Sequence, residues 1–390
     1  MKKAMPLLLL LALPFIITAQ GYKKLHAKAI VVDTHNDILM KSVDDGMVFD
    51  AGLAGKTHSD LARWKQGGLD VQLFSVFCDG EKKNPFNYAN RQMDSLDAVV
   101  ARNPDKIVKV ANEKELLKAV KQHKIAAMFG VEGGHMIEDD LTKLDSLYKR
   151  GARYMTLTWN NSTPWASSAF DETFKKDLPH KGLTNFGKQL VQRMNQLGMM
   201  VDISHVGEQT FWDVMSTTTK PVIASHSSVY NLCHHQRNLK DEQIKAIAKN
   251  GGVIQVNFNP GFIDSTFDKK QAAFMQKHKT EMDSLVKAGM HEWNIESFLF
   301  TKYKDESNPM RPPLALLIQH IEYIINLVGV DYVGLGSDFD GITITPQELD
   351  DVTSYPLITK ALADKGYSKQ DITKILGGNF LRVLKANENK

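Results

Sequence analysis

The stretch Val31-Val32-Asp33-Thr34-His35-Asn36-Asp37 joins an apolar run to a histidine and a carboxylate that lie two residues apart. Side chains alternate between the two faces of a β-strand, so His35 and Asp37 would point to the same side of a strand here. An imidazole nitrogen and a carboxylate oxygen on one side suit a divalent metal of the zinc type. The same spacing is also typical of a hydrogen-bonded pair, so the choice depends on the rest of the chain.

Short apolar runs rich in Val, Ile and Phe alternate with amphipathic segments, for example at residues 183–197 and 241–249. Near-continuous hydrophobicity predicts strands covered on both faces, and strand alternating with helix predicts a parallel sheet. Eight such units favour a closed (β/α)8 TIM-like barrel over an open doubly wound sheet, which normally carries a Gly-rich phosphate turn that is absent here. The predicted strands are 29–33, 69–77, 125–131, 152–158, 199–203, 221–225, 252–258 and 332–336.

Five of the eight predicted strands end at a residue that can bind a metal or transfer a proton. The carboxyl ends of barrel strands open onto one face, where the active sites of this fold lie. Taken singly, each histidine could be a satisfied core residue and each acid a helix or turn cap. Their shared position at strand ends predicts one metal site built from His35, Asp37, Glu132, His205 and His226, with Asp338 beside it.

This ligand set is too large for one catalytic zinc, which uses three protein ligands and a water. Two ions about 3.5 Å apart, with a hydroxide between them, would use all five ligands. His35 and Asp37 would bind one ion, His205 and His226 the other, and Glu132 both. Asp338 would then be free to take a proton from the water and return it to a leaving amine.

A substrate carboxylate needs a cationic partner, and Arg237 follows the sixth predicted strand close to His226. Its guanidinium can bind a carboxylate through two parallel hydrogen bonds. The neighbouring His234 and His235 are either additional ligands or loop residues, and the completeness of the predicted ligand set favours the second interpretation.

The composition is that of a folded globular protein, with 43% hydrophobic and 24% charged residues in 390. The formal charge is only +3, which does not suggest a nucleic-acid-binding surface. Two cysteines, Cys78 and Cys233, are too few for a zinc cluster, and the sequence leaves open whether they pair.

The N-terminus has two lysines, an apolar run over 6–17 and small residues near 18–21. This pattern is typical of a secretory signal peptide over residues 1–20, and residues 21–390 would form a single hydrolase domain. An uncleaved membrane anchor is the alternative. We expect an exported protein, periplasmic or secreted, with no stable membrane insertion after cleavage.

Between the seventh and eighth predicted strands the chain is far longer than a usual strand-to-helix connection. Residues 259–312 are therefore interpreted as an insertion on the catalytic face, with one or two amphipathic helices over 264–299. It would roof the pocket, form a homodimer contact or decorate the periphery; the sequence leaves these three roles open.

The motifs together resemble the renal or membrane dipeptidases, zinc peptidases related to the amidohydrolase barrels. The resemblance covers about residues 25–385. It implies a two-zinc barrel that hydrolyses dipeptides, with the metal ligands given above, Asp338 as acid and base, and Arg237 at the substrate carboxylate. The matching motifs are Asp33-Thr34-His35-Asn36-Asp37, Gly130-Val131-Glu132-Gly133, Thr156-Leu157-Thr158-Trp159-Asn160, Ile203-Ser204-His205-Val206, Ala224-Ser225-His226-Ser227, Arg237-Asn238, Gly336-Ser337-Asp338-Phe339 and Gly377-Gly378-Asn379-Phe380.

Two departures from the family pattern bear on the substrate. Mammalian members have a substrate-contacting histidine where this chain has Trp159, and Asn160 or Asn161 would have to replace that contact. Phe262 lies where the family often has a tyrosine. A related metal-dependent amidohydrolase, acting on N-acyl amino acids, lactams or peptidoglycan fragments, is therefore the alternative function. A binding protein on an inactivated barrel is disfavoured because every expected ligand is present.

Overall fold

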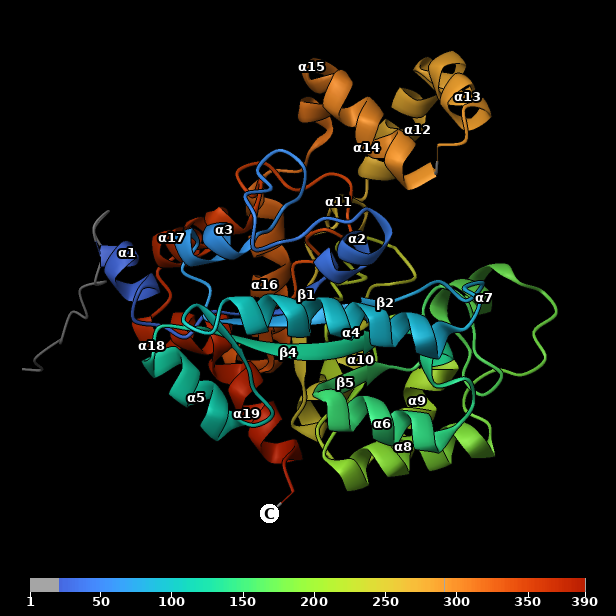
Figure 1. Cartoon of the computed structure of the whole chain (residues 1–390), viewed down its shortest axis with the longest axis vertical. Helices are drawn as coiled ribbons and strands as arrows, with labels where there is room; N and C mark the ends of the chain where they lie inside the picture. Colours follow the sequence, from blue (N-terminus) through green and yellow to red (C-terminus); the bar gives the residue numbers. More distant parts are fainter. Residues whose placement is uncertain (1–20, 291, 390) are drawn as a thin grey trace, which may run out of the picture.

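A computed structural model describes residues 21–290 and 292–389 of the chain (Figure 1). The predicted signal peptide, residues 1–20, lies outside the described residues. No helix in the described part of the chain is both long and apolar enough to cross a membrane. The strands are β1 Val32–Asn36, β2 Val71–Phe77, β3 Ile107–Lys109, β4 Ile125–Glu132, β5 Ala152–Thr156, β6 Met200–Asp202, β7 Ile223–Ala224, β8 Val253–Val256 and β9 Val333–Leu335.

Eight of these strands form a nearly closed parallel barrel, in the order β1-β2-β4-β5-β6-β7-β8-β9. The segment that follows the last strand meets β1 through a single parallel bridge between Asn36 and Phe339. Two backbone hydrogen bonds support this junction, from Asp37 N to Phe339 O (3.0 Å) and from Asp338 N to His35 O (3.2 Å). The predicted barrel is confirmed, and the predicted site residues His35, Asp37 and Asp338 flank the junction.

Most observed strand bounds lie within two residues of the sequence-based prediction, but two strands differ by more. β1 starts at Val32 and continues through His35 to Asn36, instead of covering 29–33, because the buried polar side chains at its end are satisfied by hydrogen bonds and do not interrupt the strand. The strand β3 was not predicted at all. It has only three residues and pairs with the start of β4 outside the barrel order, through Ile107 and Ile125.

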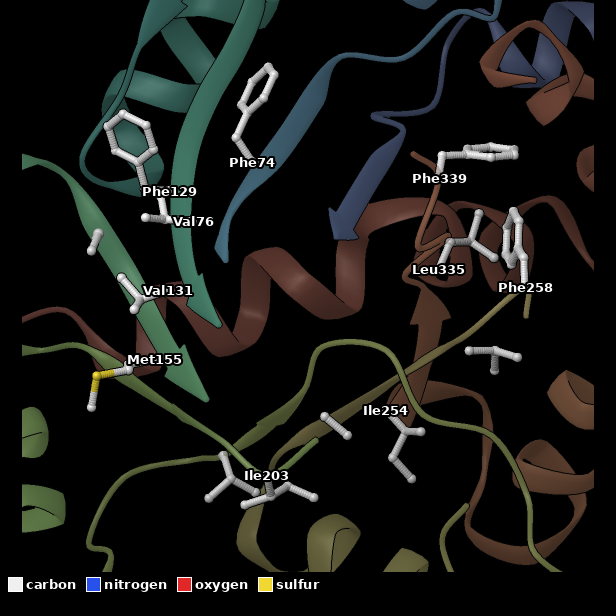
Figure 2. Packing of buried hydrophobic residues seen from close by; sticks show 14 of the residues in the cluster. Phe74, Val76, Phe129, Val131, Met155, Ile203, Ile254, Phe258, Leu335 and Phe339 are labelled. Atoms are coloured by element: carbon white, nitrogen blue, oxygen red, sulfur yellow. The ribbon is translucent and has the colours of Figure 1, made fainter. Parts of the chain in front are cut away.

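Both faces of the barrel strands are buried, as their continuous hydrophobicity predicts. In β4, Ala127, Phe129 and Val131 belong to the larger core cluster, part of which Figure 2 shows. The alternate residues Ala126 and Met128 belong to a second cluster, together with side chains of α19. The period of two therefore separates two cores along the same strand.

Helices surround the barrel and begin and end where local signals place them. For α8, the Thr184 side chain caps the first turn by accepting from Gly187 N, and Gly198 ends the helix with φ +81°. Cys78 and Cys233 are buried and unpaired. The helices are α1 Gly21–His26, α2 Ile38–Asp44, α3 Leu61–Gln66, α4 Pro85–Arg102, α5 Glu113–Lys121, α6 Leu141–Arg150, α7 Ala169–Phe174, α8 Asn185–Leu197, α9 Glu208–Thr217, α10 Asp241–Asn250, α11 Pro260–Ile263, α12 Phe267–Lys277, α13 Lys279–Lys287, α14 Glu292–Lys302, α15 Lys304–Ser307, α16 Leu314–Val328, α17 Tyr355–Asp364, α18 Lys369–Thr373 and α19 Asn379–Asn387.

The long connection between β8 and β9 is helical. Figure 1 shows α12 to α15 as a group that stands away from the barrel. The group has a small core of its own, which includes Phe274, Leu299 and Phe300. The sequence predicted one or two helices over 264–299, but three helices occur there. The helical backbone is interrupted at His278 and again near Gly289, whose φ is +82°.

His320 of α16 links three parts of the fold and makes stability depend on pH. Its Nδ1 accepts from Val229 N (3.0 Å), and its Nε2 donates to Ile263 O (3.2 Å), so the neutral ring satisfies both contacts. Burial lowers the pKa of His320 to about 4, although the Ile263 carbonyl opposes this shift. The unfolded chain binds a proton near pH 6.5, before the folded protein does.

We therefore expect that protonation of His320 in the unfolded chain lowers the free energy of unfolding by about 3 kcal/mol as the pH drops from about 7 to 4. Urea unfolding of the wild type and of His320→Gln over this range measures the contribution, because glutamine keeps one donor and one acceptor but does not titrate. A wild-type minus variant difference that stays constant with pH would contradict the assignment.

Candidate metal centre

The predicted site residues lie together at one end of the barrel, although they come from five strands. His35 is in β1, Asp37 directly precedes α2, and Glu132 is the last residue of β4. The other three residues, His205, His226 and Asp338, lie two or three positions beyond β6, β7 and β9. All six are brought to one place, as the sequence predicts.

Two of these residues have a left-handed backbone, with φ +65° at His205 and +63° at Asp338. This conformation is uncommon for residues other than glycine, so the surrounding structure must hold it. The carbonyl of His205 accepts from Ala169 N (2.8 Å), and that of Asp338 accepts from Ile342 N (3.1 Å). Both residues therefore lie in sharp turns directly after their strands.

Glu132 lies between two groups of candidate metal ligands. Its Oε2 is 3.1 Å from His35 Nε2, while its Oε1 is 2.9 Å from His205 Nε2 and 3.4 Å from His226 Nε2. Asp37 Oδ2 lies 3.5 Å from His35 Nε2, on the side of the first group. One carboxylate therefore presents one oxygen to each half of the site.

The ring nitrogens that face away from Glu132 have hydrogen-bond partners. His35 Nδ1 lies 2.9 Å from Tyr154 OH, which itself donates to Thr34 O (2.9 Å), so the tyrosine oxygen accepts the Nδ1 hydrogen. His205 Nδ1 is 3.2 Å from Asn160 Oδ1, also an acceptor. In both rings Nδ1 carries a hydrogen, so Nε2 is the nitrogen that would present a lone pair to a bound cation at the centre of the site.

The Tyr154 ring reaches His35 because the facing position in β4 is glycine. A Cβ atom at Gly130 would lie 1.9 Å from Tyr154 Cζ. Any side chain there would displace the tyrosine and leave His35 Nδ1 without this acceptor.

Burial and neighbouring charges shift the pKa values of several residues in this group. Burial opposes a charge on His35, but Glu132 and Asp37 together raise its pKa to about 10. Burial and the nearby cationic Arg237 lower the pKa of His205 to about 3, so this ring is neutral. Burial raises the pKa of Asp37 well above its ordinary value.

The donor atoms fit divalent cations. His205 Nε2 and His226 Nε2 lie 3.0 Å apart, a distance at which two neutral acceptors repel unless a cation or proton lies between them or beside them. Asp37 Oδ1 is buried and has no hydrogen-bond partner among the described residues. Imidazole nitrogens and carboxylate oxygens in this proportion suit zinc.

A cavity of about 640 Å³ opens beside these residues and contains the predicted substrate contacts. Arg237 is buried in its wall, with Nη2 3.4 Å from His226 O and with Nε and Nη1 unpaired within the described part of the chain. Burial lowers the pKa of Arg237 to about 10, so the guanidinium stays charged. The guanidinium carbon, Cζ, of Arg237 lies 5.3 Å from the centre of the Phe262 ring.

Trp159 and Asn160 also line the cavity. The Trp159 ring packs against Phe77, with centroids 5.0 Å apart, and lies 6.2 Å from the His205 ring. The side chain of Asn160 already accepts from His205 Nδ1, so it orients that ring as well as lining the cavity.

Sequence reasoning missed several residues that support the site. Asn257 donates from Nδ2 to Asp338 Oδ2 (2.9 Å), and Ser75 donates to Glu132 Oε2 (3.1 Å). His235, interpreted as a loop residue, lines the cavity and packs against Phe262 at 4.5 Å between ring centroids. Ser75 and Tyr154 lie inside strands, where the sequence gives no signal to separate them from core residues.

Comparison with known proteins agrees with this geometry. Residues 19–390 match the family model described as membrane dipeptidase, peptidase family M19. An uncharacterized dipeptidase of Schizosaccharomyces pombe is 34% identical over 394 residues, which cover 95% of this chain and 84% of that protein.

Solved structures share the fold. The probable dipeptidase PvdM from Pseudomonas aeruginosa superimposes with a TM-score of 0.77 at 24% identity, over 94% of this chain and 98% of that one. A metallo peptidase from Rhodobacter sphaeroides, liganded with a phosphinate mimic of the dipeptide L-Ala-D-Ala, gives a TM-score of 0.74 at 22% identity, over 93% and 100% of the two chains.

Proposed function

We propose that this chain, which belongs to the membrane dipeptidase family, peptidase family M19, and is a metallo-dipeptidase, uses two zinc ions to hydrolyse dipeptides. We also propose that it is exported. The observation that carries the two-ion assignment is the position of Glu132, whose two oxygens face two separate groups of donors. His35 and Asp37 would hold one ion, and His205 and His226 the other. When bound, the ions would supply Lewis acidity toward the scissile carbonyl and would lower the pKa of a water between them.

Asp338 is suited to move the proton. Burial, together with the charge of Glu132, raises its pKa to about 6, although His35 opposes the shift. Asn257 holds its Oδ2, which leaves Oδ1 to take a proton from water and to give it to the leaving amine.

Arg237 would bind the carboxylate of the substrate. Its unpaired Nε and Nη1 are buried in the cavity wall, and an unsatisfied buried guanidinium favours an anionic ligand. The Rhodobacter sphaeroides structure, with its dipeptide mimic, supports a substrate of this size. The insertion also lines the cavity, which favours a role in limiting substrate length. The lining residues that it supplies are Phe267, Asp268, Gln271, Asn294 and Glu296.

Metal removal tests the proposed chemistry. Chelation should abolish dipeptide hydrolysis, and Zn²⁺ should restore it with two ions per chain. The same samples should be assayed against L-L and L-D dipeptides, their C-terminal amides, N-acyl amino acids and lactams. Amidation should weaken hydrolysis because it removes the partner of Arg237. Activity that survives chelation would contradict the metal mechanism, and preference for lactams or acyl amino acids would favour the alternative amidohydrolase function.

Export is supported by the basic and apolar pattern of residues 1–20. N-terminal sequencing of the native protein should give a start near Gly21. An intact Met1 would contradict cleavage.

A further inference from the structure

Asp202, the last residue of β6, is buried and accepts four hydrogen bonds. Its Oδ1 accepts from Ser204 N (3.0 Å) and Ser225 N (2.9 Å). Its Oδ2 accepts from Ser225 Oγ (2.6 Å) and from the Thr156 hydroxyl. Since β6 and β7 share only one paired position, this carboxylate is a main link between the two strand ends.

Asp33 of β1 accepts the same set of hydrogen bonds at the barrel junction. Its Oδ1 accepts from His35 N (3.3 Å) and Ser337 N (2.8 Å), and its Oδ2 accepts from Ser337 Oγ and Tyr355 OH, both at 2.6 Å. In each case two backbone N–H groups face one oxygen, and two hydroxyls face the other. The two arrangements differ in the residue after the serine, which is His226 in the first case and Asp338 in the second.

This difference matters because Ser225 Oγ also lies 2.8 Å from His226 Nδ1. A serine hydroxyl has one hydrogen, and the Asp202 carboxylate can only accept it. The Ser225 oxygen must then accept the hydrogen of His226 Nδ1. This leaves Nε2, the nitrogen that faces Glu132 and His205, with a free lone pair.

We propose that Asp202 is a positioning residue that fixes the tautomer of His226 through Ser225, and so keeps Nε2 ready to bind metal. The inference rests on the assignment of His226 as a metal ligand. Asp202 contacts neither the ions nor the substrate in this arrangement; it acts through the direction of one hydrogen bond.

Asp202→Asn tests this direction without removing the contacts. The amide oxygen can still accept both backbone N–H groups, while the amide nitrogen now donates to Ser225 Oγ. The Ser225 hydrogen then turns to His226 Nδ1, and the ring hydrogen moves to Nε2, where it blocks metal binding. Asp33→Asn is the matched control, because the same exchange occurs there beside a serine that has no histidine next to it.

Two measurements on the same proteins decide between the tautomers. In metal-free protein labelled with ¹⁵N-histidine, the His226 signal, identified by its loss in His226→Gln, should change from the Nδ1–H to the Nε2–H form in Asp202→Asn only. In a chelator competition, Asp202→Asn should weaken the binding of one of the two zinc ions by roughly 10- to 100-fold, the usual effect of losing such a supporting group. Asp33→Asn should weaken it by less than about threefold.

An unchanged His226 tautomer in Asp202→Asn would overturn the proposal, and so would equal loss of zinc affinity in the two Asn variants. If Asp202→Asn does not fold, Ser225→Ala replaces it. Removal of the Ser225 hydroxyl, which accepts from His226 Nδ1, should weaken the binding of one zinc ion to a similar degree. Unchanged zinc affinity would again overturn the proposal. A wild-type protein that shows the expected tautomer and zinc affinities but hydrolyses no dipeptide would contradict the proposed function and leave this inference intact.

Discussion

Asp338→Asn should keep both metal ions and lower kcat by at least about a hundredfold, because asparagine cannot take or return a proton. The variant preserves shape and the hydrogen bond from Asn257, which can be accepted by the amide oxygen. The measurement is kcat and KM for a good dipeptide substrate, with the zinc content determined on the same sample. KM should change little, since the residue is assigned to proton transfer and not to substrate binding.

Asp79→Asn is a suitable control for this experiment. Asp79 lines the same cavity but contacts none of the proposed metal ligands through a hydrogen bond or ion pair among the described residues. Its kcat should stay within about threefold of the wild type. Full turnover in Asp338→Asn would mean that another group transfers the proton, whereas lost zinc would mean that Asp338 is itself a ligand.

Glu132→Gln should have the largest effect on metal binding. The glutamine nitrogen cannot accept, so whichever side it faces, either His35 or the His205 and His226 pair loses its carboxylate oxygen. The charge shared by the two ions is lost as well. Breaking such a buried charge interaction costs about 3–5 kcal/mol, so zinc affinity should fall by roughly a thousandfold, and activity with it. Titration of the metal-free protein with Zn²⁺ measures the change.

His35→Ala provides the comparison for Glu132→Gln. It removes a ligand from the group that contains Asp37 and leaves His205 and His226 in place. We therefore expect it to vacate one ion preferentially, while Glu132→Gln weakens both. Retention of two tightly bound ions in Glu132→Gln would exclude Glu132 as the shared ligand, and equal loss of both ions in His35→Ala would show that the two sites fill together.

The sequence was sufficient to predict the barrel and the residues that meet at its end. Parallel strands buried on both faces must be apolar along their length, so a polar residue such as Glu132 stands out where a run ends. The carboxyl ends of all strands in a closed parallel barrel lie on one face, so Glu132, His205 and Asp338 could be placed together without knowledge of any contact. The motif resemblance, which the family match confirms, led to the same fold and activity.

The tertiary structure alone decided how these residues are held. Tyr154 reaches His35 across the space left by Gly130, Asn257 holds Asp338, and Asp202 acts on His226 through Ser225. Most of these contacts join residues that are far apart in the chain, and the residues involved resemble ordinary strand residues in sequence. The residue types at the strand ends follow from local chemistry, which a sequence carries. The direction of each hydrogen bond, and with it the nitrogen that each histidine presents, depends on long-range neighbours that only the closed barrel brings together.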